Sequence, residues 1–246
     1  AELVVEIEGF LAEAGAAALE HFGAPDRYAG SLLALHDQRD PLPDPGPTLV
    51  SATGLAKSFG TNRILPGVDI VARAGEIVAV IGVNGCGKTT LLRILADQEA
   101  ADDGSVEIAG SIGYAPQTGG LDDHLLPIEH FELFGVTRGL DRAEARAGGL
   151  RLADELGWDA EHAPVAGELS GGTRQKLNVV TALLGDPDVV LLDEPCQGFD
   201  ARSSRRFWDL LDAWVGTERT AIVASHLPDV VHRAATVVEL APGEEP

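Results

Sequence analysis

Positive charge is scarce in this sequence. Its 246 residues include 18 lysines and arginines against 39 aspartates and glutamates, which gives a formal net charge of −21 at pH 7. Proteins that bind nucleic acids use basic side chains to displace counterions from the phosphates. The charge therefore argues against a nucleic-acid partner, and none is expected.

Long hydrophobic runs and cysteines are also few. The longest apolar run, residues 77–83, has seven residues, whereas a membrane-spanning helix needs about 18 or more. The two cysteines, Cys86 and Cys196, are too few for a disulfide framework and indicate a reducing compartment. The first residues carry no basic region of the kind that opens a secretory signal. We therefore expect a cytoplasmic protein that reaches the membrane only through a partner.

The sequence does contain enough apolar material for a core, since 45% of its residues are hydrophobic and 23% are charged. From Leu3 to about His36, apolar residues recur at helical spacing with a break at residues 23–25, which predicts two helices in a small N-terminal domain, residues 1–37. The chain starts without methionine and inside this pattern, which indicates that a further segment precedes it. Alternating prolines in residues 38–47 predict an extended linker.

After the linker, short apolar strands alternate with helices, so residues 48–246 are predicted to form one α/β domain. The strand at 77–81 is apolar throughout and those at 189–192 and 220–224 are predominantly apolar, as parallel strands covered on both faces are. This pattern predicts a parallel sheet.

Residues 127–157 show helical periodicity. Within them, Asp141 and Glu144 have the spacing of a capping box, and Gly157 stands as a stop signal.

A glycine-rich segment follows the predicted strand at 77–81 and precedes a helical pattern over residues 88–96. Its sequence is Gly82-Val83-Asn84-Gly85-Cys86-Gly87-Lys88-Thr89. It fits the phosphate-loop pattern G-x-x-x-x-G-K-[ST], in which backbone amides and a helix N-terminus converge on phosphates, the lysine neutralises the β and γ oxygens, and the hydroxyl binds Mg²⁺. One of only three lysines in the chain stands here. The alternative is a glycine-rich turn that binds no ligand.

Two carboxylates, Asp193 and Glu194, follow the apolar strand at 189–192. Beside a phosphate loop, an aspartate at a strand end orders Mg²⁺, and an adjacent glutamate polarises the attacking water. Taken alone, the pair is equally consistent with a solvated strand end, so its weight comes from its occurrence together with the phosphate loop.

The segment Leu169-Ser170-Gly171-Gly172-Thr173 opens another predicted helix. Backbone amides and a hydroxyl at a helix start can bind an anion. The alternative is that Ser170 is an ordinary N-cap.

From Thr48 to about Pro242 the chain resembles the nucleotide-binding subunit of ABC transporters. Six motifs occur in that family's order: Gly82–Thr90 is similar to the Walker A loop, Gln117 to the Q-loop glutamine, Leu169–Thr173 to the LSGGQ signature, Asp193-Glu194 to the Walker B pair, Asp200 to the D-loop aspartate and His226 to the switch histidine. Phe59 stands where the family places an aromatic that stacks on adenine. The chain departs from the family at Thr173, which replaces the last glutamine of the signature, and in the short interval of 29 residues between Lys88 and Gln117.

The resemblance implies a P-loop NTPase fold with a RecA-like parallel-sheet core, an antiparallel β part and a helical subdomain at about 118–178. It implies ATP and Mg²⁺ as ligands and a head-to-tail homodimer or heterodimer, in which each ATP lies between the Walker A loop of one subunit and the signature of the other. It assigns nucleotide contacts to Phe59, Asn84, Gly85, Cys86, Gly87, Lys88, Thr89, Thr90, Ser170, Gly171, Gly172 and Asp200. It assigns Mg²⁺ to Thr89, Gln117 and Asp193, and catalysis to Lys88, Gln117, Glu194 and His226.

Residues 126–135, 139–145 and 177–200 resemble ATPases of the type-2 group of multidrug and antibiotic exporters. We therefore expect an ATPase that drives export through a separate integral membrane permease, at the inner face of the cell membrane. An importer ATPase shares this chemistry and is one alternative. A soluble ABC protein that acts on ribosomes or DNA is another, but the single cassette and the negative charge argue against it. Residues 1–37 resemble the small helical HAAS domain of some bacterial membrane-associated regulators and transport proteins.

Overall fold

The computed structural model describes residues 46–225 and 230–240. The predicted N-terminal helices in residues 1–37, most of the linker, and His226 lie outside the described residues. Within the described part of the chain, no helix is both long enough and apolar enough to cross a bilayer.

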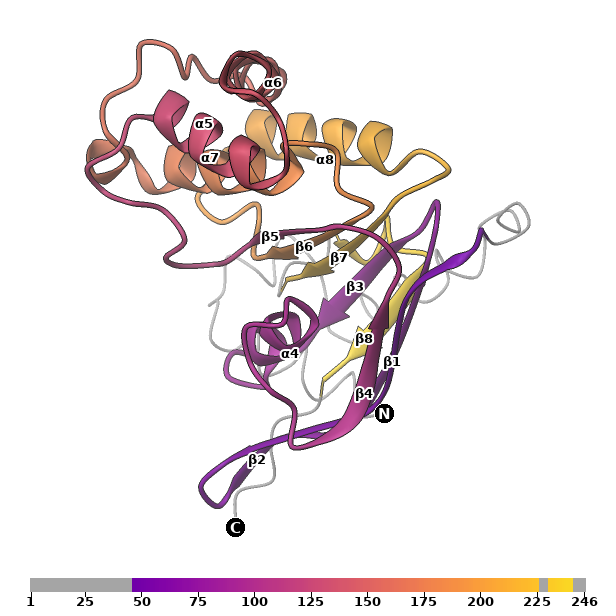
Figure 1. Cartoon of the computed structure of the whole chain (residues 1–246). Helices are drawn as coiled ribbons and strands as arrows, with labels where there is room; N and C mark the ends of the chain where they lie inside the picture. Colours follow the sequence, from indigo (N-terminus) through magenta and orange to yellow (C-terminus); the bar gives the residue numbers. More distant parts are fainter. Residues whose placement is uncertain (1–45, 226–229, 241–246) are drawn as a thin grey trace, which may run out of the picture. The chain divides into compact units, whose positions relative to one another are not determined.

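A five-stranded parallel sheet carries the site. Its strands are β3 (Ile77–Ile81), β5 (Ile112–Ala115), β6 (Val189–Asp193), β7 (Thr220–Ala224) and β8 (Thr236–Glu239), in the order β5-β6-β7-β3-β8. Each neighbouring pair is parallel, and Figure 1 shows the strands side by side. Every residue of β6 and β7 is buried, which explains why these strands are apolar except for Asp193 at the end of β6 and Thr220 at the start of β7, and confirms the predicted parallel sheet.

An antiparallel sheet forms the second layer. It contains β1 (Thr48–Phe59), β2 (Asn62–Arg73) and β4 (Asp103–Ile108), in the order β2-β1-β4. Helix α4 (Lys88–Leu95) contributes Leu91 and Leu92 to one apolar core, which also contains Leu55 of β1 and Leu191 of β6. The helix that follows the phosphate loop is therefore fixed against both sheets.

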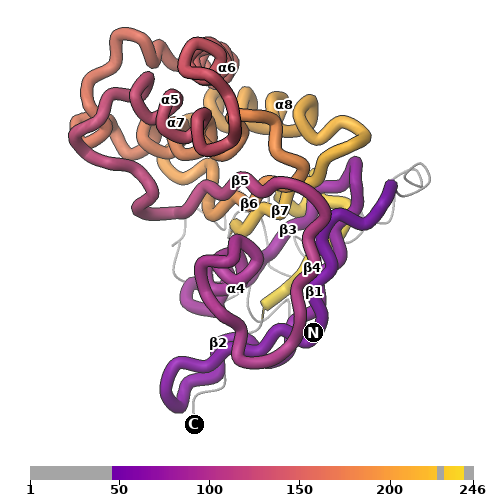
Figure 2. Tube along the Cα trace, in the orientation of Figure 1, coloured from indigo at the N-terminus to yellow at the C-terminus, as the bar shows by residue number. Residues whose placement is uncertain are grey.

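The remaining helices are α5 (Pro127–Thr137), α6 (Arg142–Glu155), α7 (Gly171–Leu183) and α8 (Ala201–Val215), with a short 3-10 turn at Ala166–Glu168. Helices α5, α6 and α7 pack on one another, and α7 also contacts β5 and β6 (Figure 2). The parallel sheet, the antiparallel sheet and these helices confirm the expected cassette fold.

The helical stretch predicted at 127–157 is divided into two helices. Asp141 caps the second, since its Oδ1 accepts from Glu144 N at 2.8 Å and its own N–H donates to Glu144 Oε2 at 3.0 Å. Gly157 follows that helix with φ of +69°, a conformation that glycine adopts without steric cost. The predicted capping box and stop signal are confirmed.

Arg138, which follows α5, caps the far end of α7. Its guanidinium donates to the carbonyl oxygens of Thr181 at 2.8 Å, Ala182 at 2.9 Å, and also Leu184. The carbonyls of a last helical turn have no partner within the helix, and burial lowers the pKa of this arginine. One side chain therefore joins α5 to the C-terminal end of α7.

Replacing Arg138 by alanine is expected to lower the free energy of unfolding by about 2 kcal/mol, because buried carbonyls lose a charged donor. Urea unfolding followed by circular dichroism measures the loss. The control is Arg146→Ala, which breaks an exposed ion pair with Glu161 at 3.0 Å and is expected to cost less than about 1 kcal/mol. Equal losses in the two variants would contradict a capping role for Arg138.

Candidate functional site

The phosphate loop connects β3 to α4, so the predicted order of strand, loop and helix is present. Two of its glycines are required by their surroundings. A Cβ added at Gly82 would lie 2.5 Å from Leu240 O, and one at Gly87 would lie 2.7 Å from Ile64 Cγ2. Gly87 also has φ of +104° at the N-cap position of α4, which disfavours any other residue. The loop is therefore held close against the core, with the N-terminus of α4 at its end.

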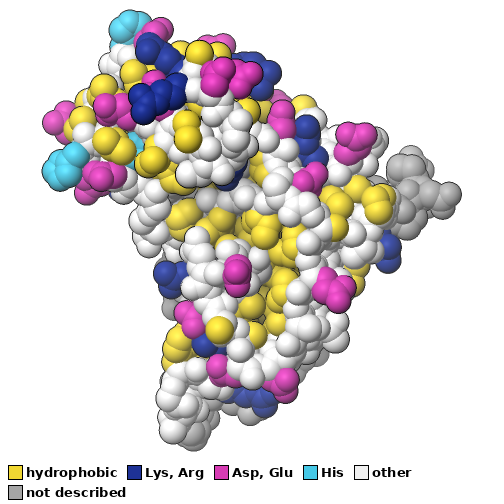
Figure 3. Space-filling view, viewed as in Figure 1, with side chains coloured by type: hydrophobic (Ala, Val, Ile, Leu, Met, Phe, Trp, Pro, Cys, Tyr) yellow, Lys and Arg dark blue, Asp and Glu magenta, His cyan; other side chains and the backbone are white. Residues whose placement is uncertain are grey.

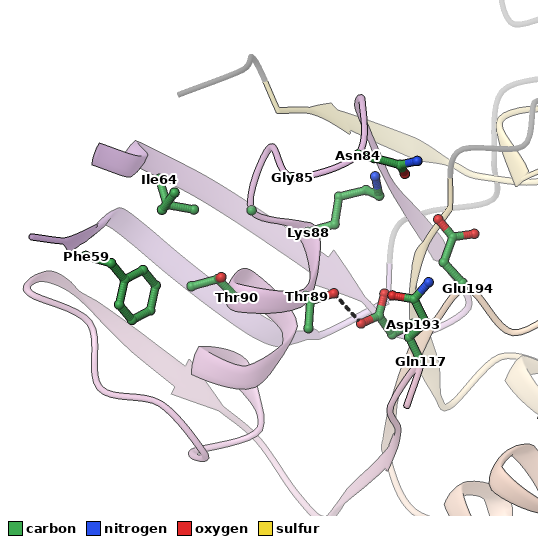
Figure 4. A pocket seen from close by; sticks show the side chains of 11 residues that line it. Phe59, Ile64, Asn84, Gly85, Lys88, Thr89, Thr90, Gln117, Asp193 and Glu194 are labelled. Carbon is green, nitrogen blue, oxygen red and sulfur yellow. Dashed lines mark hydrogen bonds between the residues drawn. The ribbon is translucent and has the colours of Figure 1, made fainter. Parts of the chain in front are cut away.

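Lys88 is the first residue of α4 and is only 7% exposed. Its ammonium donates to Gly82 O at 2.7 Å and Val83 O at 3.1 Å. The loop thus holds the cation in place through its own carbonyls, and Figure 4 shows the side chain extended beneath the loop. A buried cation beside backbone amides is the arrangement that phosphate binding requires.

A cavity of about 360 Å³ lies in front of the loop. Most of the residues assigned from the sequence to nucleotide, metal or catalysis line it, together with Ile64, which the sequence did not indicate. The lining residues are Phe59, Ile64, Asn84, Gly85, Gly87, Lys88, Thr89, Thr90, Gln117, Asp193 and Glu194. Cys86 belongs to the loop but does not line the cavity, because its side chain is buried beneath the loop, 1% exposed.

Asp193 ends β6 and faces α4. Thr89 Oγ1 donates to Asp193 Oδ2 at 2.7 Å, as drawn in Figure 4. Burial raises the pKa of the Asp193 carboxyl and the negative charge of Glu194 adds to this, whereas the hydrogen bond from Thr89 and the charge of Lys88 oppose it. A cation brought to this carboxylate would relieve the cost of its burial.

The side chains at this point suit Mg²⁺. Mg²⁺ takes oxygen ligands, usually one or two carboxylates together with waters and substrate phosphates. The Thr89 hydroxyl, the Asp193 carboxylate and the Gln117 side-chain oxygen, all on the same cavity, supply the protein's part of such a set. The amide of Gln117 also donates to Gln197 Oε1 at 3.5 Å.

Glu194 has an unusual backbone conformation. Its φ is +49°, and such a left-handed conformation costs a non-glycine residue about 1–3 kcal/mol. Its N–H donates to Ala224 O at 2.9 Å and its carbonyl accepts from Gln197 N at 3.0 Å. Ser225 Oγ donates to Glu194 Oε2 at 3.2 Å. The surrounding structure thus fixes a strained residue so that its carboxylate lies at the cavity.

The other predicted residues within the described part of the chain do not line this cavity. Ser170 caps α7, since its Oγ accepts a hydrogen bond from Thr173 N at 3.2 Å. The hydroxyl groups of Ser170 and Thr173 are also hydrogen-bonded to each other, with 2.8 Å between their oxygens. The hydroxyl of Thr173 therefore has a local partner. Gly172 packs against the loop after β6, where an added Cβ would lie 2.4 Å from Gly198 O. Asp200 caps α8 by accepting from Ser203 N at 2.7 Å, and this hydrogen bond lowers its pKa. None of Ser170, Gly171, Gly172 and Asp200 lines the described cavity.

Comparison with known proteins shows which family the chain belongs to. Residues 65–197, more than half of the chain, match the family model described as ABC transporter. The chain is 37% identical over 197 residues to the aliphatic sulfonates import ATP-binding protein of Nocardia farcinica, covering 79% of this chain and 78% of that protein. It is 33% identical over 204 residues to the Nod factor export ATP-binding protein I of Azorhizobium caulinodans, covering 78% of this chain and 63% of that protein.

Solved structures agree in fold. A bacterial ABC transporter cassette with a dimeric structure superposes with a TM-score of 0.71 at 22% identity, covering 78% of this chain and 94% of the other.

Proposed function

Because the chain belongs to the ABC transporter family, as an ATP-binding subunit that hydrolyses ATP, we propose that it drives export through a separate membrane-spanning subunit, with the described cavity as its ATP site. The observation that carries the proposal is that Lys88, Asp193 and Glu194 meet in this one cavity, at the carboxyl ends of parallel strands β3 and β6. Ligands bind at that edge of open α/β sheets.

Each lining residue then has a chemical task. The loop amides and the N-terminus of α4 receive the β and γ phosphates, and Lys88 neutralises part of their charge. Thr89, Asp193 and Gln117 would hold Mg²⁺, which would supply charge stabilisation on the phosphate oxygens. Glu194 accepts a hydrogen bond from the attacking water and orients it for in-line attack on the γ-phosphate. Phe59, which is 52% exposed on the cavity, offers its ring to adenine.

In this proposal a protein with a negative net charge binds ATP, which is itself highly negative. The arrangement of charged groups in the cavity explains how this is possible. Figure 3 shows Asp and Glu side chains spread over several elements of the viewed face. In the cavity, two carboxylates face Lys88 and the loop amides. With Mg²⁺ at Asp193, the charge that the phosphates meet is set by these groups rather than by the net charge of −21.

Ser170, Gly171 and Gly172 belong, in our proposal, to the site of a second subunit. They lie at the N-terminus of α7 and line no part of this subunit's own cavity, which supports a head-to-tail dimer that brings them to the partner's ATP. The proposal extends to Asp200, as the D-loop aspartate that contacts nucleotide, and to His226, as a γ-phosphate contact. Whether the two subunits are identical is decided by co-purification.

Export is the direction that we propose, with the chain peripheral to the inner face of the cell membrane through its permease. The likeness of residues 126–135, 139–145 and 177–200 to exporter ATPases and a relative named for Nod factor export support it. A relative named for aliphatic sulfonates import makes import the competing direction.

Three measurements test the proposal. The purified chain should release phosphate from ATP with Mg²⁺ and lose this activity in excess EDTA. The tagged chain, recovered from detergent-solubilised membranes of its own organism, should bring down an integral membrane protein. Inverted vesicles that contain this pair should then accumulate a transported compound when ATP is added outside. Recovery of ribosomes in place of a membrane protein, or transport in the opposite direction, would contradict the proposal.

The Phe59 ring has a cation beside it that should affect ATP binding. Lys57 Nζ lies 5.3 Å from the ring centroid and is held by Glu99 at 2.8 Å and by Ala100 O at 2.6 Å. A cation near an aromatic face contributes about 0.5–1 kcal/mol at exposed sites. Lys57→Met should therefore raise the ATP dissociation constant about two- to fivefold while kcat changes less than about twofold. Isothermal titration with ATP and steady-state assays measure the two effects, and an unchanged dissociation constant would contradict a role for Lys57 in positioning the ring.

A further inference from the structure

Helix α7 carries two buried amide side chains whose role the motifs do not explain. Gln175 is 5% exposed and Asn178 is 3% exposed. They are three residues apart and therefore lie on one face of the helix. A buried amide is costly unless hydrogen bonds satisfy it, so their partners indicate what they do.

The partners are the backbone of the two segments that line the cavity. Gln175 Nε2 donates to Asp193 O at 3.4 Å and to Glu194 O at 3.3 Å. Asn178 Nδ2 donates to Gln175 Oε1 at 3.4 Å and to Pro116 O at 3.4 Å, and Pro116 directly precedes Gln117. The amide pair thus ties the end of β6 to the segment that carries Gln117.

The position of the two acceptor carbonyls is informative. Asp193 O and Glu194 O belong to the two peptide groups that flank the Cα of Glu194, so a single side-chain amide restrains both backbone torsions of that residue. Glu194 is also the one non-glycine residue lining the described cavity that has a left-handed φ, at +49°. A conformation of this kind persists only where its surroundings over-determine it.

We propose that Gln175 is a positioning residue for the Glu194 carboxylate, with Asn178 orienting the Gln175 amide. This inference rests on the role proposed above for Glu194. Gln175 does not line the cavity, so its effect passes through the backbone of Glu194 rather than through ATP. Misplacement of a catalytic group by about 1 Å can cost up to about 10²-fold in rate.

The test is Gln175→Met, which keeps the length of the side chain and removes both donors. We expect kcat for ATP hydrolysis to fall about tenfold or more, while the dissociation constant of a fluorescent ATP analogue changes less than twofold and the melting temperature stays within a few degrees. Asn178→Ala should show the same pattern with a smaller loss. The matched control is Thr181→Val, a buried hydroxyl on the same helix that bonds only Asn178 O within the helix at 2.9 Å.

A double variant separates positioning from general damage. If Gln175 acts through Glu194, then adding Gln175→Met to Glu194→Gln should lower the residual hydrolysis no further, because the group that it positions is already disabled. Multiplying losses in the double variant would overturn the inference, as would kcat values of Gln175→Met and Asn178→Ala equal to that of Thr181→Val. If Gln175→Met does not fold, Asn178→Ala decides by the same criteria. Full hydrolysis by Glu194→Gln, by contrast, would overturn the role proposed for Glu194 itself.

Discussion

Replacing Glu194 by glutamine is expected to reduce ATP hydrolysis by a factor of about 10² to 10³ while ATP binding is retained. Glutamine has nearly the same shape, and its amide oxygen can still accept the hydrogen bond from Ser225 Oγ, so the strained backbone conformation remains supported. What is lost is the carboxylate that is proposed to hold and polarise the attacking water. Phosphate release and binding of a fluorescent ATP analogue measure the two properties separately.

The same variant should accumulate as an ATP-bound dimer, because the nucleotide that is proposed to join the subunits is no longer consumed. Light scattering after size-exclusion chromatography should show the molecular mass roughly doubled with ATP and unchanged with ADP. The control is Glu161→Gln, which alters only an exposed ion pair with Arg146 and should hydrolyse ATP normally. Rapid hydrolysis by Glu194→Gln would remove this residue from the catalytic role.

The parts of the site that were predictable from sequence are those that chemistry ties to neighbouring residues in the chain. The phosphate loop needs glycines, a lysine and a hydroxyl at fixed spacing, so Gly87, Lys88 and Thr89 are recognisable without any structure. The apolar strand before Asp193 likewise predicted that the carboxylates of Asp193 and Glu194 lie at the end of a buried strand. The cavity brings these segments together although more than 100 residues separate Thr89 from Asp193.

The residues that sequence analysis missed act through tertiary contacts. Gln175, Ser225 and Ile64 are ordinary residues in ordinary positions, and their significance comes from the carbonyl, carboxylate or cavity that folding places beside them. Arg138 caps a helix whose end lies more than 40 residues away in the chain, so no local pattern marks it. For Cys86 the structure adds the direction of the side chain, which is buried in the core, so a contact of this loop residue with the nucleotide stays a prediction that concerns its backbone.

The second large effect is expected at Asp193, where activity and stability should change in opposite directions. Asp193→Asn removes the carboxylate that is proposed to hold Mg²⁺, and hydrolysis should fall by about 10²-fold or more, since such a metal contributes several kcal/mol to the transition state. In the nucleotide-free protein, however, the same change should raise the melting temperature at pH 7. The neutral amide can still accept the hydrogen bond from Thr89 and avoids burying a negative charge.

The pH dependence of this stability difference follows from the direction in which the pKa of Asp193 is shifted. Burial raises the pKa of Asp193 in the folded state above its value of about 3.9 in the unfolded chain. The folded protein therefore holds this proton over a pH range in which the unfolded chain has released it, and stability falls as pH rises through the folded pKa. The advantage of Asp193→Asn should be present at pH 7 and should disappear below about pH 4. Thermal melts without nucleotide at several pH values measure it.

Asp188, just before the other end of β6, provides a matched control with the opposite sign. Its Oδ2 accepts from Ser111 N at 2.7 Å and Ser111 Oγ at 2.8 Å, and these hydrogen bonds lower its pKa. Its carboxylate stabilises the fold above the unfolded pKa, and that contribution is lost as pH falls through the folded pKa. Asp188→Asn should therefore lower the melting temperature at pH 7 and leave ATP hydrolysis intact. If both aspartate variants shift the melting temperature in the same direction at pH 7, the buried charge at Asp193 is not a cost to folding, and the opposition of stability and metal binding at this strand end is refuted.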